Sequence, residues 1–194
     1  DDGVTTRLGE NHYIMTTTTG GAATVMGKLE DYLQTEWPDL KVFLTSVTDH
    51  FATVSVCGPN SKKILEKVVR NINFNDQNFP HMSFKEGLID NINCRVMRIS
   101  FTGELSYEIN IQANYGNAVW KKCMEVGKEF NFTPYGTEAM QLLRAEKGFV
   151  IVGQETDGTI TPIDLQMDWI VSKKKYDFIG KRSLYRSDTI KEGR

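Results

Sequence analysis

The stretch TGELSYEINI, residues 102–111, has the alternating pattern of a β-strand. Apolar and polar side chains alternate along it, so that Tyr107 and Ile109 share one face of a predicted strand. Glu108 and Asn110 share the other face. An ionised carboxylate only accepts hydrogen bonds and takes two of them side by side. The sequence therefore predicts a strand whose Glu108 suits a ligand with two adjacent N–H donors.

The residues around this stretch extend the pattern into an α+β fold. The preceding run RVMRISF, residues 95–101, also alternates, and residues 102–106 form a short connection. Hydrophobic periodicity and turn residues predict strands over 4–8, 12–18, 42–47, 51–57, 92–101 and 107–111, an extended run at 82–84, and helices over 22–37, 61–69, 115–130 and 136–147. The polar segment 71–80 reads as a loop, which predicts two α+β subdomains, residues 1–72 and 73–194.

The composition excludes several functional classes. The 194 residues are 40% hydrophobic and 25% charged with a net charge of −2, typical of a globular domain. This balance gives no basic surface for nucleic acid or for an anionic membrane. No apolar stretch approaches the roughly 20 residues that cross a bilayer. The chain begins without a methionine, which favours a fragment of a longer protein.

The three cysteines indicate neither a disulfide framework nor a metal site. Cys57, Cys94 and Cys123 are odd in number, far apart and flanked by apolar residues. We expect buried, unreactive thiols in a reducing compartment, and hence a cytoplasmic location. The loop 153–159 lacks the acidic spacing of a calcium site, so no metal is predicted.

The amino-acid sequences of several motifs are specific to one superfamily. TGELSYE at 102–108 resembles the pattern T-G-E-x-x-[YF]-E of the aminomethyltransferase (glycine-cleavage T-protein) superfamily, which binds tetrahydrofolate. DDGVT at the start, LRAEKG at 143–148 and GQETDGTITP at 153–162 extend the resemblance over nearly the whole chain. It is strongest to one branch, the carboxy-terminal folate-binding part of the alpha subunit of bacterial heterotetrameric sarcosine oxidase. The resemblance implies an aminomethyltransferase-like fold of antiparallel sheets and packed helices, here without its N-terminal part and its C-terminal barrel.

The resemblance assigns roles to two carboxylates. It implies that Glu108 grips the pterin ring of tetrahydrofolate, whereas the sequence alone also allows an exposed carboxylate on an edge strand. Asp1 and Asp2 resemble the D-D pair of the superfamily, whose second member is the catalytic carboxylate. Asp2 is therefore the predicted catalytic residue, although an acidic pair at a chain end is also typical of a solvated terminus.

The resemblance implies two further folate contacts, Phe101 and Arg144, and the sequence departs from the family pattern at Phe101 and at Met140. Phe101 stands where relatives carry a folate-contacting tyrosine, so a ring contact is retained and a hydrogen bond is lost. Arg144 is a predicted folate contact, with a structural ion pair on its helix as the alternative. Met140 stands where relatives carry another arginine, which predicts a different hold on the folate.

The function implied by the resemblance is one-carbon transfer. A methylene unit from sarcosine, oxidised elsewhere in the complex, would pass to tetrahydrofolate and give 5,10-methylenetetrahydrofolate. Flavin (FAD and FMN) and NAD sites would lie outside this chain, and the partners would be the other sarcosine oxidase subunits, with neither nucleic acid nor membrane. The alternatives are a sibling folate-dependent demethylase, a glycine-cleavage-type aminomethyltransferase, against which Phe101 and Met140 argue, and a non-catalytic folate-binding or scaffold module.

Overall fold

A computed structural model describes residues 2–186 of the chain. The chain separates into two compact units, residues 1–149 and 150–194. The first unit holds all the strands and α-helices of the described residues. In the second, the described residues form turns and the short 3₁₀ helices Asp168–Ile170 and Arg182–Tyr185. The predicted boundary after residue 72 falls inside the first unit, and the two predicted subdomains stay a prediction.

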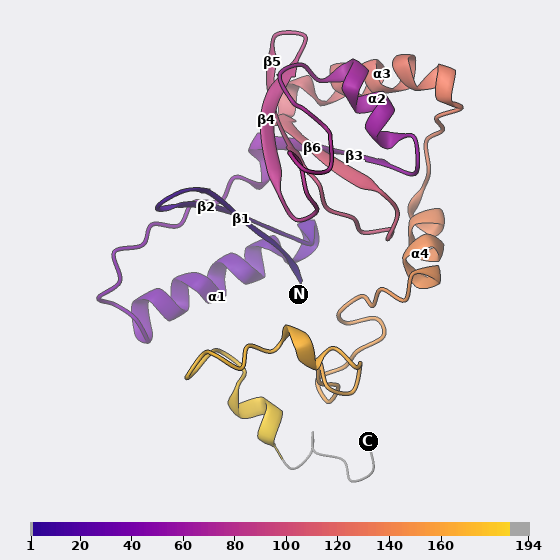
Figure 1. Ribbon diagram of the computed structural model, residues 1–194. Helices are drawn as coiled ribbons and strands as arrows, with labels where there is room; N and C mark the ends of the chain where they lie inside the picture. Colours follow the sequence, from indigo (N-terminus) through magenta and orange to yellow (C-terminus); the bar gives the residue numbers. More distant parts are fainter. Residues whose placement is uncertain (1, 187–194) are drawn as a thin grey trace. The chain divides into compact units, whose positions relative to one another are not determined.

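The N-terminal part of the first unit is a β-hairpin followed by a helix (Figure 1). Strand β1 (Gly3–Gly9) pairs antiparallel with β2 (His12–Thr17), as the sequence predicts. The following helix α1 (Ala22–Thr35) ends shortly before Pro38. Half-buried apolar side chains on α1 include Val25, Met26, Leu29 and Leu33, and no residue of α1 is fully buried.

The centre of the first unit is a four-stranded antiparallel sheet with the strand order β3-β6-β5-β4. Its strands are β3 (Phe51–Cys57), β4 (Phe84–Ile89), β5 (Ile92–Met97) and β6 (Ser106–Gln112). Strand β6, which contains Glu108, is paired on both sides. Side chains on β6 are therefore held by two neighbouring strands.

One face of this sheet is the hydrophobic core. Helices α2 (Ser61–Val68) and α3 (Gly116–Gly127) contact each other and pack on this face (Figure 1). The core side chains alternate along the strands with the polar ones, which fixes the register because a shift of one residue would exchange the faces. The core includes the strand residues Val54, Val56, Val96, Tyr107, Ile109 and Ile111 and the α2 residues Ile64 and Leu65.

Two strand predictions are corrected by the structure. Residues 42–47 form no strand, since their backbone pairs with no described neighbour, and Phe43 is 94% exposed. Strand β4 was not predicted at its full length because Lys85, Glu86 and Gly87 weaken the apolar pattern, as is common on an edge strand. The α+β class is confirmed, and no closed barrel is present in the described residues.

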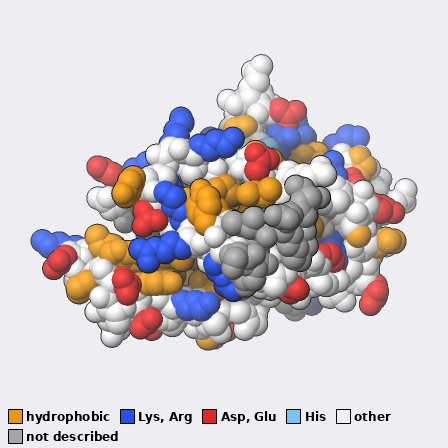
Figure 2. Space-filling view, turned by 90° about the horizontal axis from the view of Figure 1, so that it is seen from below, with side chains coloured by type: hydrophobic (Ala, Val, Ile, Leu, Met, Phe, Trp, Pro, Cys, Tyr) orange, Lys and Arg blue, Asp and Glu red, His pale blue; other side chains and the backbone are white. Residues whose placement is uncertain are grey.

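The remaining helices follow the prediction closely. Helix α4 (Thr137–Glu146) lies within the predicted span, and the α3 region continues into a 3₁₀ turn, Lys128–Phe130. None of the described helices is long and apolar enough to span a bilayer. Hydrophobic side chains also remain at the surface, where Figure 2 shows them in patches between charged groups. The exposed ones include Phe43 in the first unit and Trp169 and Tyr176 in the second.

Candidate functional site

Glu108 is held on the sheet face opposite the core. Its neighbours across the ladder are Ser55 on β3 and Met97 on β5. Tyr107 and Ile109, which flank it, are fully buried on the other face, so the predicted alternation is confirmed. Glu108 itself is half-buried, and this burial raises the pKa of its carboxyl group above the usual value. The chain therefore fixes a partly desolvated carboxylate on a rigid strand.

Strand β1 lies against the same polar face of the sheet. The Thr6 hydroxyl donates a hydrogen bond to the Met97 sulfur at 3.4 Å, and Met97 is 1% exposed. Because side chains alternate along a strand, Asp2 and Val4 lie on the same side of β1 as Thr6. Asp2 is exposed, and it immediately precedes β1. The strand after Asp2 thus contacts the face that carries Glu108 through Thr6.

A glycine makes this arrangement of β1 possible. A Cβ atom at Gly3 would lie 1.8 Å from the backbone oxygen of Thr16 on β2. Only glycine therefore permits the first pair of the hairpin to close directly after Asp2. The neighbouring Asp1 of the D-D motif lies outside the described residues.

A cavity of about 460 Å³ lies beside this face. Val4 of β1, the connection between β5 and β6, and the residues after α4 line it. The connection contributes Ser100, whose buried hydroxyl oxygen has no hydrogen-bond partner among the described residues, and Ser106, which is on the Glu108 side of β6. The cavity therefore offers polar groups next to the strand that carries Glu108.

The turn of the TGE motif is shaped by glycine as well. Gly103 has a φ of +81°, a region that favours glycine, and the Lys147 side chain packs where a Cβ would stand. Arg144 is 5% exposed, and its guanidinium donates hydrogen bonds to Gln141 at 3.0 Å and to the Phe149 carbonyl at 3.1 Å. Arg144 thereby holds Phe149, which lines the cavity together with Lys147.

The predicted site residues converge only in part. Glu108 and the strand after Asp2 belong to the same sheet face. Phe101 is 42% exposed in the β5–β6 connection, between the cavity residues Ser100 and Gly103. None of Glu108, Asp2, Phe101 and Arg144 is itself a lining residue of the cavity. Their roles toward folate stay predictions.

Tyr135 lies next to Glu108, which the sequence did not predict. Its hydroxyl donates to Ser55 Oγ at 3.5 Å, the long limit of a hydrogen bond, from the loop that precedes α4. Burial raises the pKa of Tyr135, and Cys57 and the Glu108 charge raise it further. Tyr135 therefore lies close to Glu108, across the strand pair that contains Ser55. The turn signal Pro134-Tyr135-Gly136 marks a loop, but no local pattern indicates which strand that loop reaches.

Comparison with known families identifies this arrangement. Residues 1–175 match the GCVT N-terminal domain. The chain belongs to the GCVT N-terminal domain family. Its two antiparallel sheets with packed helices agree with the aminomethyltransferase-like fold that the motifs predict.

Relatives of this GCVT domain have two kinds of name. The sarcosine oxidase subunit alpha of Corynebacterium sp. (strain P-1) is 54% identical over the whole chain, and that of Rhizobium meliloti (strain 1021) is 43% identical over 96% of it. The aminomethyltransferase of Halothermothrix orenii is 35% identical over 72% of the chain and 38% of its own length. The chain spans about a fifth of the sarcosine oxidase subunits, at 20% and 19% of their lengths.

In the described residues of the GCVT domain, the side chains that could hold a metal ion are those of His, Cys, Asp and Glu. Among residues 2–186, no group of three or more His, Cys, Asp and Glu side chains is arranged to hold one. All three cysteines are free; Cys94 and Cys123 are buried and Cys57 is half-buried. Burial raises the pKa of Cys94 and of Cys123 to about 11, so both remain neutral thiols at physiological pH.

Proposed function

We propose that this GCVT domain binds tetrahydrofolate and passes a one-carbon unit to it as part of a sarcosine oxidase alpha-type subunit. The observation that carries the proposal is Glu108, a half-buried carboxylate on the polar face of a doubly paired strand. The strand that begins after Asp2 packs on the same face. Membership of the family and 54% identity to a sarcosine oxidase subunit alpha support it.

Glu108 suits the pterin edge of tetrahydrofolate. That edge presents an amino group and a ring N–H side by side, and an ionised carboxylate accepts both. The cavity that adjoins the polar face has a volume of about 460 Å³, which is within the size range of small-molecule sites. The unpaired Ser100 hydroxyl and the exposed Phe101 ring offer one polar and one aromatic contact next to it. Arg144 supports the site by holding Phe149, in addition to its predicted folate contact.

Asp2 supplies proton transfer in the proposed reaction. Tetrahydrofolate supplies the two nitrogens that take up a methylene unit as two C–N bonds form. When the unit arrives as the iminium of oxidised sarcosine, its bond to the amine nitrogen breaks, and both folate N–H protons leave with the amine as glycine. Asp2 accepts a proton from the folate side and returns it to the departing amine, while Glu108 fixes the ring for attack.

The one-carbon unit would come from outside this chain, and the redox chemistry that produces it would also take place there. We propose that sarcosine is oxidised on another segment or subunit of the complex, which also holds the flavins and NAD. The product of transfer is 5,10-methylenetetrahydrofolate. The partners are then the remaining sarcosine oxidase subunits in the cytoplasm.

The test separates binding from turnover in the complete protein complex. We expect Asp2→Asn to keep the affinity for tetrahydrofolate within about two-fold and to lower the yield of methylene-folate per turnover by 10²-fold or more, the usual contribution of an acid–base group. A formaldehyde scavenger in the assay ensures that only units transferred within the protein are counted. Glu10→Gln, in the exposed turn of the same hairpin, is the matched control.

The outcomes decide between the proposal and its rivals. Unchanged methylene-folate formation in Asp2→Asn would remove the catalytic role and favour a non-catalytic folate-binding module. Transfer of a methylene unit from an aminomethylated carrier protein, in place of oxidised sarcosine, would favour a glycine-cleavage-type enzyme. Absence of any saturable folate binding would overturn the proposal as a whole.

A further inference from the structure

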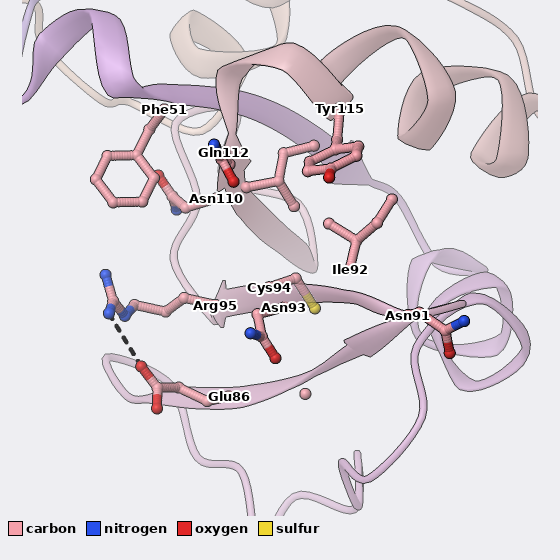
Figure 3. A pocket seen from close by; sticks show the side chains of 12 residues that line it. Phe51, Glu86, Asn91, Ile92, Asn93, Cys94, Arg95, Asn110, Gln112 and Tyr115 are labelled. Carbon is pink, nitrogen blue, oxygen red and sulfur yellow. Dashed lines mark hydrogen bonds and ion pairs between the residues drawn. The ribbon is translucent and has the colours of Figure 1, made fainter.

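A second cavity lies where strands β5 and β6 diverge (Figure 3). The two strands pair only from Cys94 and Ile111 to Met97 and Glu108. Beyond that point Asn93 pairs only with β4 and Gln112 only with β3, so the sheet opens. The gap is a cavity of about 580 Å³. Glu108 does not line this second cavity. The second cavity also shares no lining residue with the cavity of about 460 Å³ described above.

The lining of this cavity combines amide side chains with two rings. Figure 3 shows Asn110 between the Phe51 ring and Arg95, with Gln112 and Tyr115 across the opening from Asn93. The Phe51 and Tyr115 side chains are about one-third exposed, at 36% and 39%. One acidic side chain, Glu86, lines the cavity, and it is ion-paired with Arg95 at 2.9 Å.

Two hydrogen-bond donors in this cavity are buried and unsatisfied among the described residues. Asn110 is 5% exposed; its Oδ1 accepts a hydrogen bond from Thr53 at 3.0 Å, while its Nδ2 has no acceptor. Arg95 donates to Glu86 through one terminal nitrogen, while its Nε has no acceptor. Arg95 and Asn110 are direct partners across the β5–β6 ladder. The two donors therefore project from neighbouring positions on the same sheet face.

Buried donors without acceptors are rare because their desolvation is not compensated, and each such group calls for a partner. Two neighbouring donors, one of them on a guanidinium, match an acceptor with two oxygens in one plane. Glu86 already neutralises part of the Arg95 charge, which favours a monoanion over a phosphate dianion. The rings of Phe51 and Tyr115 suit a flat apolar body attached to the acid.

We propose that this cavity binds a small organic acid, whose carboxylate accepts hydrogen bonds from Asn110 Nδ2 and Arg95 Nε and whose flat apolar part lies between Phe51 and Tyr115. Asn110 and Arg95 lie on the same face of the sheet as Glu108, but this cavity shares no lining residue with the cavity of about 460 Å³, and the proposal does not depend on the proposed folate chemistry. It would let the level of a small carboxylic acid influence the sheet that carries Glu108.

The test is a titration of the complete protein with benzoate, followed by calorimetry and by protein NMR. Benzyl alcohol, which has the ring without the carboxylate, is the matched probe. We expect saturable benzoate binding and at least ten-fold weaker benzyl alcohol binding. Asn110→Asp keeps the acceptor for Thr53 and replaces the donor by a negative oxygen, so it should weaken benzoate binding at least ten-fold.

Two further variants test the site independently of Asn110→Asp. Asn93→Asp at the exposed rim adds the charge without touching the buried amide, and several-fold weaker benzoate binding is expected there even if Asn110→Asp fails to fold. Glu108→Gln should leave benzoate affinity unchanged. The proposal is overturned if benzoate does not bind, if benzyl alcohol binds equally well, if both cavity variants bind benzoate normally, or if Glu108→Gln abolishes binding.

Discussion

Replacing Glu108 by glutamine separates the function of this side chain from its effect on stability. The amide has nearly the shape of the carboxylate, but it offers one acceptor and one N–H₂ donor. Toward a ligand edge with two N–H donors, one charge-assisted hydrogen bond is lost and one donor meets another donor. Each of these effects is worth roughly 1–3 kcal/mol. Because Glu108 is only half-buried, we take about 3 kcal/mol in total, which corresponds to roughly 150-fold weaker folate binding.

The same substitution has the opposite effect on stability. Burial raises the pKa of Glu108 in the folded state, so the folded protein binds this proton more tightly than the unfolded chain. The contribution of Glu108 to the free energy of unfolding therefore falls as pH rises from the unfolded carboxyl pKa through the raised folded pKa, and is constant above it. Glu108→Gln removes this loss. The variant should be more stable than the wild type at neutral pH, and the difference should vanish below the unfolded pKa.

Folate affinity by calorimetry and urea unfolding between pH 4 and pH 8 measure both effects in the complete protein. Glu66→Gln, on helix α2 at the opposite face of the sheet, is the control and should change neither by much. Wild-type affinity should also decline on acidification at a higher pH than an ordinary glutamate would give. The reasoning is refuted if Glu108→Gln binds folate normally, or if it destabilises the protein at neutral pH and so loses binding through unfolding.

Two further substitutions test the framework of the site. Gly3→Ala places a Cβ against the Thr16 oxygen, so it should destabilise the hairpin by about 1–3 kcal/mol and lower one-carbon transfer more than folate affinity. Thermal unfolding measures the stability, and product assays measure the transfer. The control is Gly20→Ala, whose Cβ meets nothing within 4 Å. Tyr107→Phe removes a fully buried hydroxyl that has no partner among the described residues. It should raise the free energy of unfolding by about 1 kcal/mol in urea titrations, and an equal loss of stability would show that the hydroxyl is satisfied.

Local sequence patterns predicted the elements whose signals are self-contained. The alternation around Glu108 predicted which side chains of β6 face the core, and Tyr107 and Ile109 are buried there. The prediction failed where pairing decides: residues 42–47 have strand composition but no partner, and the charged edge strand β4 is a strand because β5 pairs with it. Strand propensity is a property of a single segment, whereas a strand forms only when a second segment pairs with it.

Tyr135 and Asn110 show the same limit at the functional sites. Nothing in the sequence around Tyr135 indicates that its loop reaches Glu108 or reaches Ser55, which is 80 positions earlier in the chain. Asn110 reads as the polar side of a strand, and its unsatisfied amide emerges only from its pairing with Arg95 and from the Thr53 hydrogen bond. Hydrogen-bond satisfaction depends on all neighbours of a group, which are distant in sequence.

Local sequence patterns suffice to predict the α+β class, the face of β6 on which Glu108 lies and the family to which the motifs point. Three features depend on tertiary packing: the contact of β1 with that face through Thr6, the cavity beside it that Ser100 borders, and the opening of the sheet at Asn93 and Gln112. The physical reason is that periodicity is set by bonded neighbours along the chain. Burial, cavities and unpaired donors are set by which distant strands pack together.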